Sequence, residues 1–329
     1  IGIIRLGVKA ASEEMIASQI IEEMEYQPNI LASTLASKKT FSFALIVPEP
    51  VTPEAYWNKP LIGVKKAFDE IQQYGVNISL HFFKQSDPET FKKESRLILE
   101  NNPEGVVLAP FFSRESKEFI EELKSREIPY VFIDSNIKDS SKLSYIGQDS
   151  FQSGTLAAKL LDYALPDQAT ILILHFAKEL DNMNHLVQRE KGFYEYFKNK
   201  QVSGDRNLIT LEIADPNDSG CQNRIRQQIE SNKTIKGIFV TNSQVYYLGR
   251  ILEQFRIDEI RVIGHDLIKE NIEFLKKGMV DFLICQRPEE QGYRAILTLF
   301  EHIVLKKEVN AENYTSIDII TKENLDYYK

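Results

Sequence analysis

The sequence predicts an α/β fold of two consecutive units, each a doubly wound parallel sheet with helices on both faces. The first observation is length, because 329 residues correspond to about two domains at roughly 150 residues each. The second is an alternation of short, wholly apolar runs with amphipathic stretches of about 10–15 residues, which is typical of parallel sheets. The third is that the alternation starts again near Gln148–Ser150, so each half can hold its own core.

Four strands and three helices are expected in the first unit, which begins at Thr40. The strands are apolar throughout, as in FSFALIV and YVFID, and the helices carry apolar residues at helical spacing, as Leu61, Val64 and Phe68 do. The expected strands are Phe41–Val47, Val76–Phe83, Gly105–Ala109 and Tyr130–Asp134, and the expected helices are Leu61–Tyr74, Glu89–Asn101 and Ser116–Arg126.

The second unit repeats the pattern with further strands and helices. Runs such as ATILILH and GIFVT are apolar throughout, which again indicates strands buried on both faces. The expected strands are Ala169–His175, Asn207–Ile213, Gly237–Thr241, Arg261–Gly264, Val280–Cys285 and Ser316–Thr321. The expected helices are Gly154–Leu165, Asn184–Lys200, Gly220–Ser231, Gln244–Phe255, Ile268–Lys277 and Glu289–Lys306.

Residues 1–40 do not share this alternation and are too few to hold a core of their own. Ser12–Met24 is predicted to be a helix, because Ser12 is a good N-cap and acidic residues occupy the first turn. A break at Tyr26–Asn29 precedes a second short helix, Ile30–Ala36. The segment is either part of a truncated domain or an arm. Because the chain begins with Ile rather than Met, we expect its natural N-terminus to lie upstream.

Composition and motifs exclude several classes of protein. A formal net charge of -8 argues against a protein that coats nucleic acid through charge alone, although a small DNA-binding segment stays possible. Cys221 and Cys285 form no zinc motif, and two buried thiols are favoured over one disulfide. No apolar run is long enough for a membrane helix, and the start does not resemble a signal peptide. Nucleotide-binding, metalloprotease and hydrolase motifs do not occur, so we expect no enzyme activity, no cofactor and no metal.

Polar residues recur directly after the apolar strands. They are Asp134, Gln148, Asp149, His175, Asn242, Asp266 and Gln286. Ligands of open α/β sheets bind outside the carboxyl ends of the strands, and two such sheets can face each other across a cleft. Carboxylates and amides with one or two aromatic rings suit a polyhydroxylated ligand such as a sugar, whose hydroxyls both donate and accept. For each residue alone, a turn or helix-capping role is the alternative.

Six segments in chain order resemble the lactose-repressor (LacI) family of transcription regulators, and the resemblance extends over essentially the whole chain. The first, YQPNILASTLASKKTFSFALIVPEP, resembles the family's junction from headpiece through hinge helix to the first effector-domain strand. The others resemble the family's V-x-x-D-N-x-x-G, R-x-x-G-F, strand-end Asn-Asp, V-x-G-x-D and Q-x-x-x-x-x-G motifs. They are IGQDSFQSG (146–154), REKGF (189–193), IFVTNS (238–243), VIGHD (262–266) and CQRPEEQGYRA (285–295).

The resemblance implies two lobes of the type I periplasmic-binding-protein kind, joined by a hinge of three chain crossings. It divides the chain into a headpiece and hinge-helix remnant, an N-terminal lobe and a C-terminal lobe. Their expected ranges are 1–40 for the remnant, 41–149 plus 287–308 for the N-terminal lobe and 150–286 plus 309–329 for the C-terminal lobe. A ligand in the cleft could then close the lobes as rigid bodies.

The family's ligand positions fall on five residues here. They are Asp149, Arg189, Asn242, Asp266 and Gln286. Arg189 would fork to ring and hydroxyl oxygens, and Asp266 would accept from two hydroxyls. Asp134 is a further candidate from its place after a strand. Tyr56 and Trp57 follow the first strand and could supply a stacking surface, whereas packing within the lobe is the alternative for Trp57.

The chain also departs from the family pattern. Ser150 and Ser243 stand where the family usually has Asn and Asp, and the first loop, PEPVTPEAYW, is longer than the common form. These changes affect the identity of the ligand more than the fold. The family's A-x-x-A-G-V-S recognition segment is not found, so only the third headpiece helix and the hinge helix are expected.

The resemblance also implies contacts to DNA in the hinge segment, where Tyr26 and Asn29 belong to the junction motif. Family precedent makes Leu35 a wedge in the minor groove and brings Lys38 and Lys39 to phosphates. A homodimer on a near-palindromic operator is expected. The alternative is an exposed leucine beside solvated lysines. Residues 1–40 hold four basic and five acidic side chains, a net of -1, so we expect these 329 residues to bind operator DNA poorly.

Three functions remain open. The leading hypothesis is a cytoplasmic, sugar-responsive transcription regulator, in which ligand and operator affinity are reciprocally coupled. The second is a solute-binding protein that delivers a sugar to a transporter. The third is an α/β enzyme that uses Asp134 or Asp149 as a base with Arg189 stabilising charge, although no nucleophile or metal set supports it.

Overall fold

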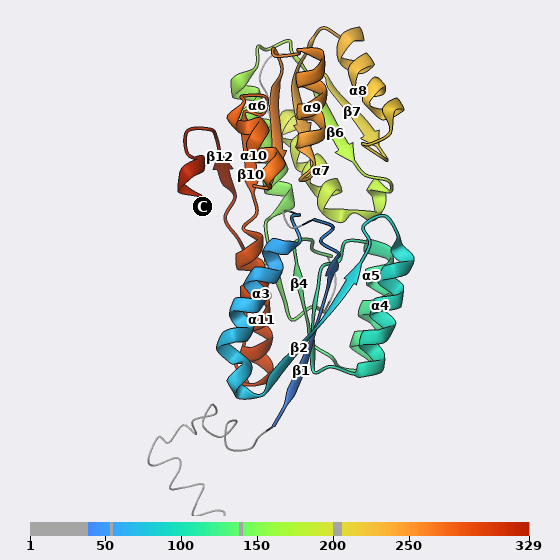
Figure 1. Ribbon diagram of the computed structural model, residues 1–329, viewed down its shortest axis with the longest axis vertical. Helices are drawn as coiled ribbons and strands as arrows, with labels where there is room; N and C mark the ends of the chain where they lie inside the picture. The colour runs from blue at the N-terminus through green and yellow to red at the C-terminus, as the bar shows by residue number, and fades with distance from the viewer. Residues whose placement is uncertain (1–38, 53–54, 138–140, 200–205, 329) are drawn as a thin grey trace, which may run out of the picture.

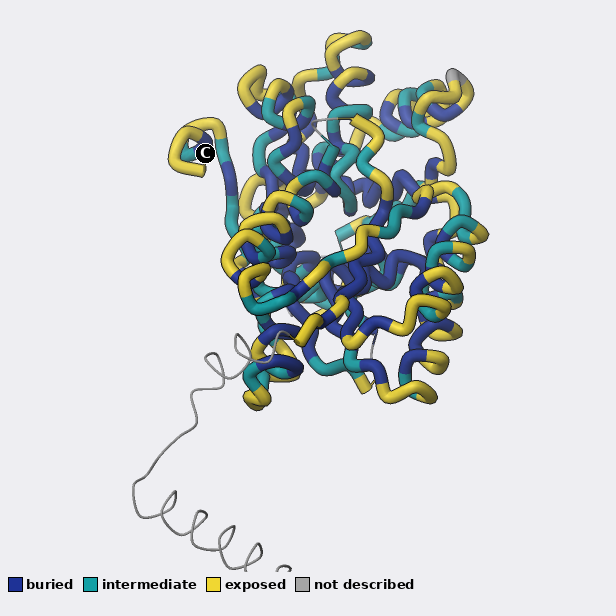
Figure 2. Tube along the Cα trace, turned by 60° about the horizontal axis from the view of Figure 1, so that its bottom comes forward, coloured by how far each residue is buried: buried dark blue, intermediate teal, exposed yellow. Residues whose placement is uncertain are grey.

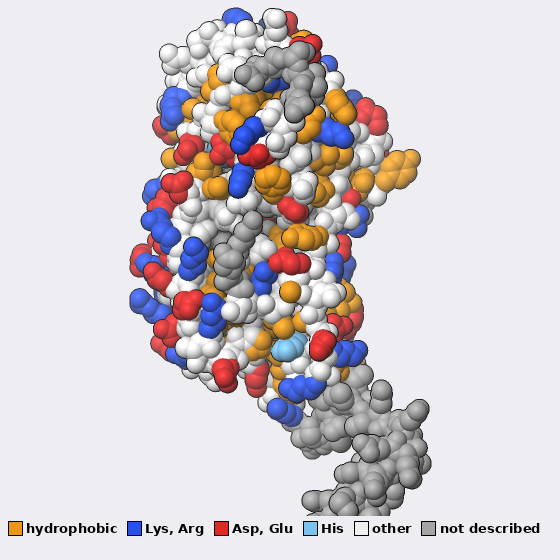
Figure 3. Space-filling model, turned by 180° about the vertical axis from the view of Figure 1, so that it is seen from behind, with side chains coloured by type: hydrophobic (Ala, Val, Ile, Leu, Met, Phe, Trp, Pro, Cys, Tyr) orange, Lys and Arg blue, Asp and Glu red, His pale blue; other side chains and the backbone are white. Residues whose placement is uncertain are grey.

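A computed structural model describes residues 39–52, 55–137, 141–199 and 206–328. It confirms an α/β fold of two lobes, each built on one six-stranded sheet and stacked end to end (Figure 1). In Figure 2 the buried residues run through the middle of both lobes, and exposed residues lie on the outer faces of the helices. The face shown in Figure 3 carries basic and acidic side chains intermixed over both lobes.

The first sheet is wholly parallel, with strand order β11-β5-β4-β3-β1-β2. Helices α3 and α11 pack together on one side, and α4 and α5 pack together on the other. The strands are β1 (Phe41–Pro48), β2 (Val76–Phe83), β3 (Gly105–Leu108), β4 (Tyr130–Ile133), β5 (Ser144–Gly147) and β11 (Glu312–Tyr314). The helices are α3 (Asn58–Ile71), η1 (Gln72–Tyr74), α4 (Pro88–Asn101), α5 (Ser113–Ser125) and α11 (Pro288–Ile303).

The second sheet has the order β12-β10-β9-β8-β6-β7 and is parallel except for β12. Its strands are β6 (Thr170–Phe176), β7 (Leu208–Ile213), β8 (Ile235–Val240), β9 (Arg261–His265), β10 (Phe282–Cys285) and β12 (Asp318–Ile320). Its helical elements are α6 (Ser150–Ala164), η2 (Leu180–Asn182), α7 (Asn184–Asn199), α8 (Ser219–Ser231), α9 (Val245–Phe255), α10 (Lys269–Lys276) and η3 (Leu325–Tyr327).

Strand β6 shows why both faces of the second sheet are covered. Leu172 and Leu174 lie in the cluster shared with α8, α9 and α10, whereas Ile171 and Ile173 lie in the cluster shared with α6 and α7. Successive side chains of a strand point to opposite faces, so a run without polar residues needs helices on both sides. The apolar sequence TILILHF therefore dictates a doubly covered strand.

Helices α6 and α7 approach each other through two glycines. A Cβ atom at Gly154 would lie 1.8 Å from the carbonyl oxygen of Arg189, and one at Gly192 would lie 1.9 Å from that of Phe151. Only glycine permits this separation of the two backbones. The contact fixes the first half of α7, from which Arg189 projects.

The lobes also touch directly beside the cleft. Ala177, Leu180, Met183 and Leu186 follow β6 of the second sheet but belong to the apolar core of the first lobe. Asn182 accordingly reaches the start of α5, where its side chain contacts Arg114 and Glu115. The two lobes thus share a continuous apolar contact on this side.

The structure corrects several expectations about the elements. Strand β11 was not anticipated, and it pairs with β5, so the chain returns to the second sheet after Tyr314 rather than after residue 308. Its sequence ENY is short and mostly exposed at a sheet edge, so it carries no apolar alternation. The predicted strand Ser316–Thr321 is shorter, at Asp318–Ile320. Other ends differ by a few residues. The expected helices within residues 1–38 lie outside the described residues.

Candidate functional site

A cavity of about 630 Å³ lies between the carboxyl ends of the two sheets. Its walls come from both lobes, as the strand-end positions predict. Seven of the eight predicted ligand residues line it: Tyr56, Trp57, Asp134, Arg189, Asn242, Asp266 and Gln286. The eighth, Asp149, is not part of this lining.

Asp134 follows β4 and is 6% exposed. The hydroxyl of Tyr56 donates a hydrogen bond to its Oδ1 at 2.7 Å. Burial raises the pKa of the Asp134 carboxyl, whereas the Tyr56 hydrogen bond and the positive charge of Arg189 act in the opposite direction. Its φ of 66° is in the left-handed region, which a non-glycine residue adopts only when its surroundings hold it there.

Asp266 follows β9 in the second lobe and has a similar environment. Gln286 Nε2 donates to both of its carboxylate oxygens, at 3.0 Å each. Burial raises the pKa of Asp266 to about 7, against the opposing effects of Arg189 and Gln286. Its φ is 70°, so both strand-end aspartates have left-handed backbones. Each lobe therefore contributes one buried carboxyl with an elevated pKa.

Arg189 projects from α7 and is 1% exposed. Its Nη1 donates to the carbonyl oxygen of Thr241 at 2.7 Å. Its Nε and Nη2 have no hydrogen-bond partner among the described residues. Those two nitrogens form one edge of the guanidinium, which suits a ligand with two neighbouring acceptor atoms. A buried donor pair without a partner costs free energy, so this edge is poised to be completed by a ligand.

The aromatic surface of the cavity begins with Tyr56 and Trp57. Their ring centroids are 5.2 Å apart and the rings are nearly perpendicular, at 89°. Trp57 is 4% exposed and belongs to the apolar core of the first lobe, yet it also lines the cavity. Packing and a ligand-facing surface are therefore compatible for this residue.

Asn242 and Asp149 show the two outcomes for a strand-end polar residue. Asn242 lines the cavity, but its side chain also donates to the Phe176 carbonyl at 2.8 Å and accepts from the Gln244 amide at 3.2 Å. Asp149 is the N-cap of α6, where its Oδ1 accepts from the amide of Gln152 at 3.0 Å. The capping alternative therefore describes what Asp149 does in this structure, and its ligand contact stays a prediction.

The sequence did not single out several residues that the fold brings to the cavity. They are Phe111, Phe176, His185 and Tyr246. His185 is 8% exposed, and its Nδ1 has no partner among the described residues. Burial, followed by the charge of Arg189, lowers the pKa of His185 to about 3, so the ring is neutral and can offer a hydrogen bond. His185 lies in helix α7 and does not follow a strand, so a search for polar residues after strands does not find it.

Three further observations on the described residues concern metal ligands, membrane helices and cysteines. No group of three or more His, Cys, Asp or Glu side chains that could hold a metal occurs among them. Within the same ranges, no helix is long and apolar enough to cross a membrane. Cys221 and Cys285 are buried free thiols. Of the predicted DNA-contacting residues, Lys39 is exposed and lies over the Phe41 ring, whereas the other four lie outside the described residues. They are Tyr26, Asn29, Leu35 and Lys38.

Comparison with known proteins agrees with the fold. The family model of the periplasmic binding protein domain matches residues 43–308. The HTH-type transcriptional repressor PurR of Pasteurella multocida is 26% identical over 310 residues, which cover 92% of this chain and 86% of PurR.

Two solved structures share the fold of this chain. A Bacteroides fragilis structure assigned as a LacI transcriptional regulator is 33% identical, covers 88% of this chain and 100% of its own, and superposes with a TM-score of 0.82. The glucose-galactose binding protein GanP of Geobacillus stearothermophilus shares the fold at 22% identity and a TM-score of 0.77, covering 87% of this chain and 99% of its own. The chain therefore belongs to the periplasmic binding protein domain family, in its LacI-like branch.

Proposed function

We propose that this chain is the effector-binding part of a DNA-binding transcription regulator, whose cleft binds a small carbohydrate. The observation that carries the proposal is the unpaired edge of Arg189, buried beside Asp134 and Asp266 between the two lobes. PurR and the LacI-assigned structure are each similar over most of the chain, at 26% and 33% identity, whereas GanP covers as much of it at 22%. The higher identities support the regulator role.

A sugar satisfies the groups that line the cleft. Its ring and hydroxyl oxygens can accept from Arg189, and its hydroxyls can donate to Asp134 and Asp266. The apolar C–H face of the ring can lie against Trp57. The donors and acceptors come from both lobes, so a bound sugar favours the closed arrangement of the lobes.

The coupling to DNA would act through the segment before β1. Leu35 would enter the minor groove, Lys38 and Lys39 would contact phosphates, and two copies would pair on the operator. Closure of the lobes would change the orientation of the paired segments, so ligand and operator affinities would change by the same factor. We place the protein in the cytoplasm, as a homodimer without enzyme activity.

The test of ligand binding is a thermal-shift and calorimetric screen with D-ribose, L-arabinose, D-xylose, D-glucose, D-galactose, maltose and lactose. A sugar at 100 times its Kd should raise the free energy of unfolding by about 2.7 kcal/mol. Arg189→Met should abolish that increase. Binding of no sugar in the panel, or equal binding by Arg189→Met, would contradict the proposal.

The test of regulation uses a form of the protein that includes the complete headpiece. Operator sites selected from random DNA should be bound in gel shifts, and the sugar that binds should change that affinity. The second candidate, a sugar-binding protein for a transporter, shares the cleft and is favoured by the fold of the solved sugar-binding proteins. It predicts sugar binding with no sequence-specific DNA binding, so the same gel shift separates the two functions.

A further inference from the structure

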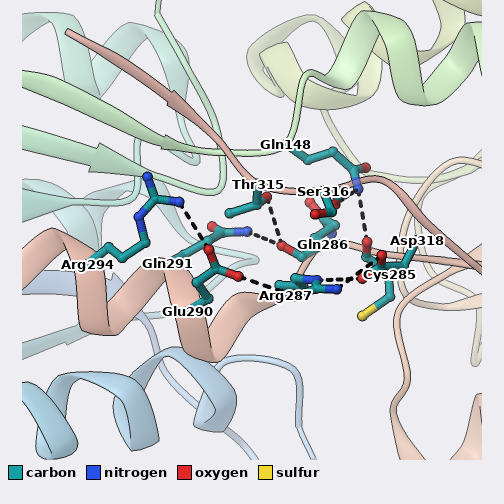
Figure 4. A network of polar contacts seen from close by, with 10 residues as sticks. All are labelled: Gln148, Cys285, Gln286, Arg287, Glu290, Gln291, Arg294, Thr315, Ser316 and Asp318. Carbon is teal, nitrogen blue, oxygen red and sulfur yellow. Dashed lines mark hydrogen bonds and ion pairs between the residues drawn. The ribbon is translucent and has the colours of Figure 1, made fainter. Parts of the chain in front are cut away.

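The three chain crossings between the lobes are tied together by buried polar side chains (Figure 4). Gln148 of the first crossing donates through Nε2 to the carbonyl of Cys285, at 3.0 Å, in the second. Thr315 of the third crossing donates through Oγ1 to the carbonyl of Gln286 at 3.2 Å. The peptide groups at the end of β10 thus lie at the centre of the hinge.

Gln291 enters this network from the first turn of α11 and is fully buried. Its Oε1 accepts from the backbone N–H of Asp134 at 2.8 Å. Its Nε2 donates to the carbonyl of Gln286, also at 2.8 Å. One amide therefore joins a strand end of the first lobe to the end of β10 from the second, and both of its polar atoms are used.

Each of the two residues whose backbone Gln291 contacts either carries or contacts a carboxyl of the cleft. The backbone of Asp134 is left-handed, and its N–H is held by Gln291 while its carboxylate takes the hydroxyl of Tyr56. Gln286, whose carbonyl Gln291 holds, uses its own side chain to hold both oxygens of Asp266. Gln291 itself does not line the cavity. Its two hydrogen bonds therefore connect the carboxyl of Asp134 in one lobe with that of Asp266 in the other.

We propose that Gln291 is a positioning residue for the ligand, which holds Asp134 and, through Gln286, Asp266 at the separation that the ligand needs. The proposal deepens the proposed function and rests on it for the ligand. Without the amide, the N–H of Asp134 loses its partner, and the left-handed strand end is free to relax. The cleft would still contain Asp134 and Asp266, but the separation between their carboxyls would no longer be fixed.

Gln148 provides a matched control. It is also a buried glutamine of the hinge, 1% exposed, and its Nε2 bonds only carbonyls of Cys285 and Ser316. Those carbonyls hold no carboxyl of the cleft. Gln291→Met and Gln148→Met each remove the two hydrogen bonds of one hinge amide at nearly constant side-chain volume. A merely structural hinge role predicts equal effects on sugar binding.

The experiment measures by calorimetry the Kd of the strongest binder among D-ribose, L-arabinose, D-xylose, D-glucose, D-galactose, maltose and lactose, using the 329-residue chain. Gln291→Met should weaken binding roughly 30-fold, because a buried donor is left unsatisfied, and Gln148→Met by about 3-fold or less. In an Asp134→Asn background, where the cleft carboxyl is already changed, Gln291→Met should weaken binding by about 5-fold or less. Equal weakening by the two glutamine variants, or the same factor in both backgrounds, would overturn the proposal.

Hydrogen exchange of the ligand-free chain tests, without any sugar, whether Gln291 holds the backbone of Asp134. Gln291→Met should speed exchange of the Asp134 amide, compared in peptides that cover residues 128–137, whereas Gln148→Met should leave it near the wild-type rate. Unchanged exchange in Gln291→Met would overturn the proposal. If no sugar of the panel binds the wild-type chain, the proposed function fails, and this exchange measurement alone decides whether Gln291 holds Asp134.

Discussion

Arg189 is a buried cation whose free-energy cost in the folded chain a ligand could offset. Its guanidinium is buried beside two carboxyls, yet it makes one hydrogen bond and no ion pair among the described residues. Uncompensated burial of this kind is unfavourable unless another molecule completes the contacts. We therefore expect the residue to contribute more to ligand binding than to folding.

The first prediction concerns this residue. Arg189→Met should weaken sugar binding at least about 100-fold, and Arg189→Lys by roughly 10-fold or more, because lysine keeps the charge but loses the planar fork. Calorimetry measures both. Arg261→Met, which changes an exposed arginine paired with Asp281 at the start of β9, is the control and should bind normally. Normal binding by Arg189→Met would contradict the assignment.

The second prediction concerns pH. Burial raises the pKa of Asp266 to about 7 in the folded chain, against about 3.9 in an unfolded one. The folded state therefore holds the proton more tightly, so this contribution to stability is complete below pH 4 and is lost as pH rises towards 7. Asp266→Asn removes the loss and should make the ligand-free protein more stable at pH 8 by roughly 2–4 kcal/mol.

Urea unfolding of both proteins between pH 4 and 8 measures this difference. His185 and His265, whose pKa values are lowered by burial, favour folding as pH rises and are common to both proteins, so they cancel in the comparison. The difference should vanish near pH 4. A difference that is constant with pH would mean that Asp266 does not carry the elevated pKa.

The position of most candidate site residues was predictable because they follow strands. Asp134, Asp266 and Gln286 are fixed by chain geometry at the carboxyl edge of a sheet, and the family resemblance added Arg189. Asp149 occupies an equivalent place in the sequence, but it caps α6. Strand-end position alone cannot distinguish the two roles, because both need an oxygen acceptor at the same point of the chain.

At the scale of elements, strands buried on both faces were the most predictable part of the fold. TILILHF and FSFALIV leave no polar face, so they are compatible only with a covered sheet. Strand β11, ENY, was not predictable, because its pairing with β5 depends on a chain crossing rather than on its own residues. The start of α6 at Ser150 was also missed, since the predicted helix began at Gly154.

The third prediction concerns the contact of α6 with α7. Gly154→Ala would put a Cβ atom against the Arg189 carbonyl, so the helices must separate. We expect a loss of about 1–3 kcal/mol in the free energy of unfolding, together with weaker sugar binding as Arg189 shifts. Gly220→Ala, in the exposed first turn of α8, is the control and should be neutral or slightly stabilising. Denaturant unfolding and calorimetry measure both effects; a fully stable Gly154→Ala would show that the helices yield easily.

At the scale of the whole molecule, the two lobes meet through polar contacts beside the cleft as well as through the hinge. Asn182 accepts from the Arg114 amide at 2.9 Å and donates to Glu115 at 3.0 Å, at the start of α5. Arg114 also pairs with Glu179 at 2.6 Å, but both side chains are largely exposed. Asn182 is 1% exposed, so its contacts are the ones protected from water.

The fourth prediction follows from this difference. Asn182→Ala should favour separation of the lobes and weaken sugar binding about 10-fold, because buried hydrogen bonds between the lobes are lost. Glu179→Ala should change binding by about 2-fold or less, since an exposed ion pair contributes little. Calorimetry measures binding, and small-angle scattering should show a larger radius of gyration for ligand-free Asn182→Ala. Equal effects of the two variants would contradict the prediction that the hydrogen bonds of Asn182 hold the two lobes together.

The crossing topology has a consequence for the order in which the protein is made. All the strands of the second sheet except β12 precede residue 286, whereas the first sheet receives α11 and β11 only from residues 288–314. During synthesis the N-terminal lobe therefore leaves the ribosome first but lacks one covering helix and an edge strand until residues 288–314 have been made. An uncovered apolar sheet is prone to aggregation, and the late pairing spans a long stretch of chain. The later-synthesised lobe can thus mature before the earlier one, and a nascent chain stalled near residue 286 should be the species that most needs a chaperone.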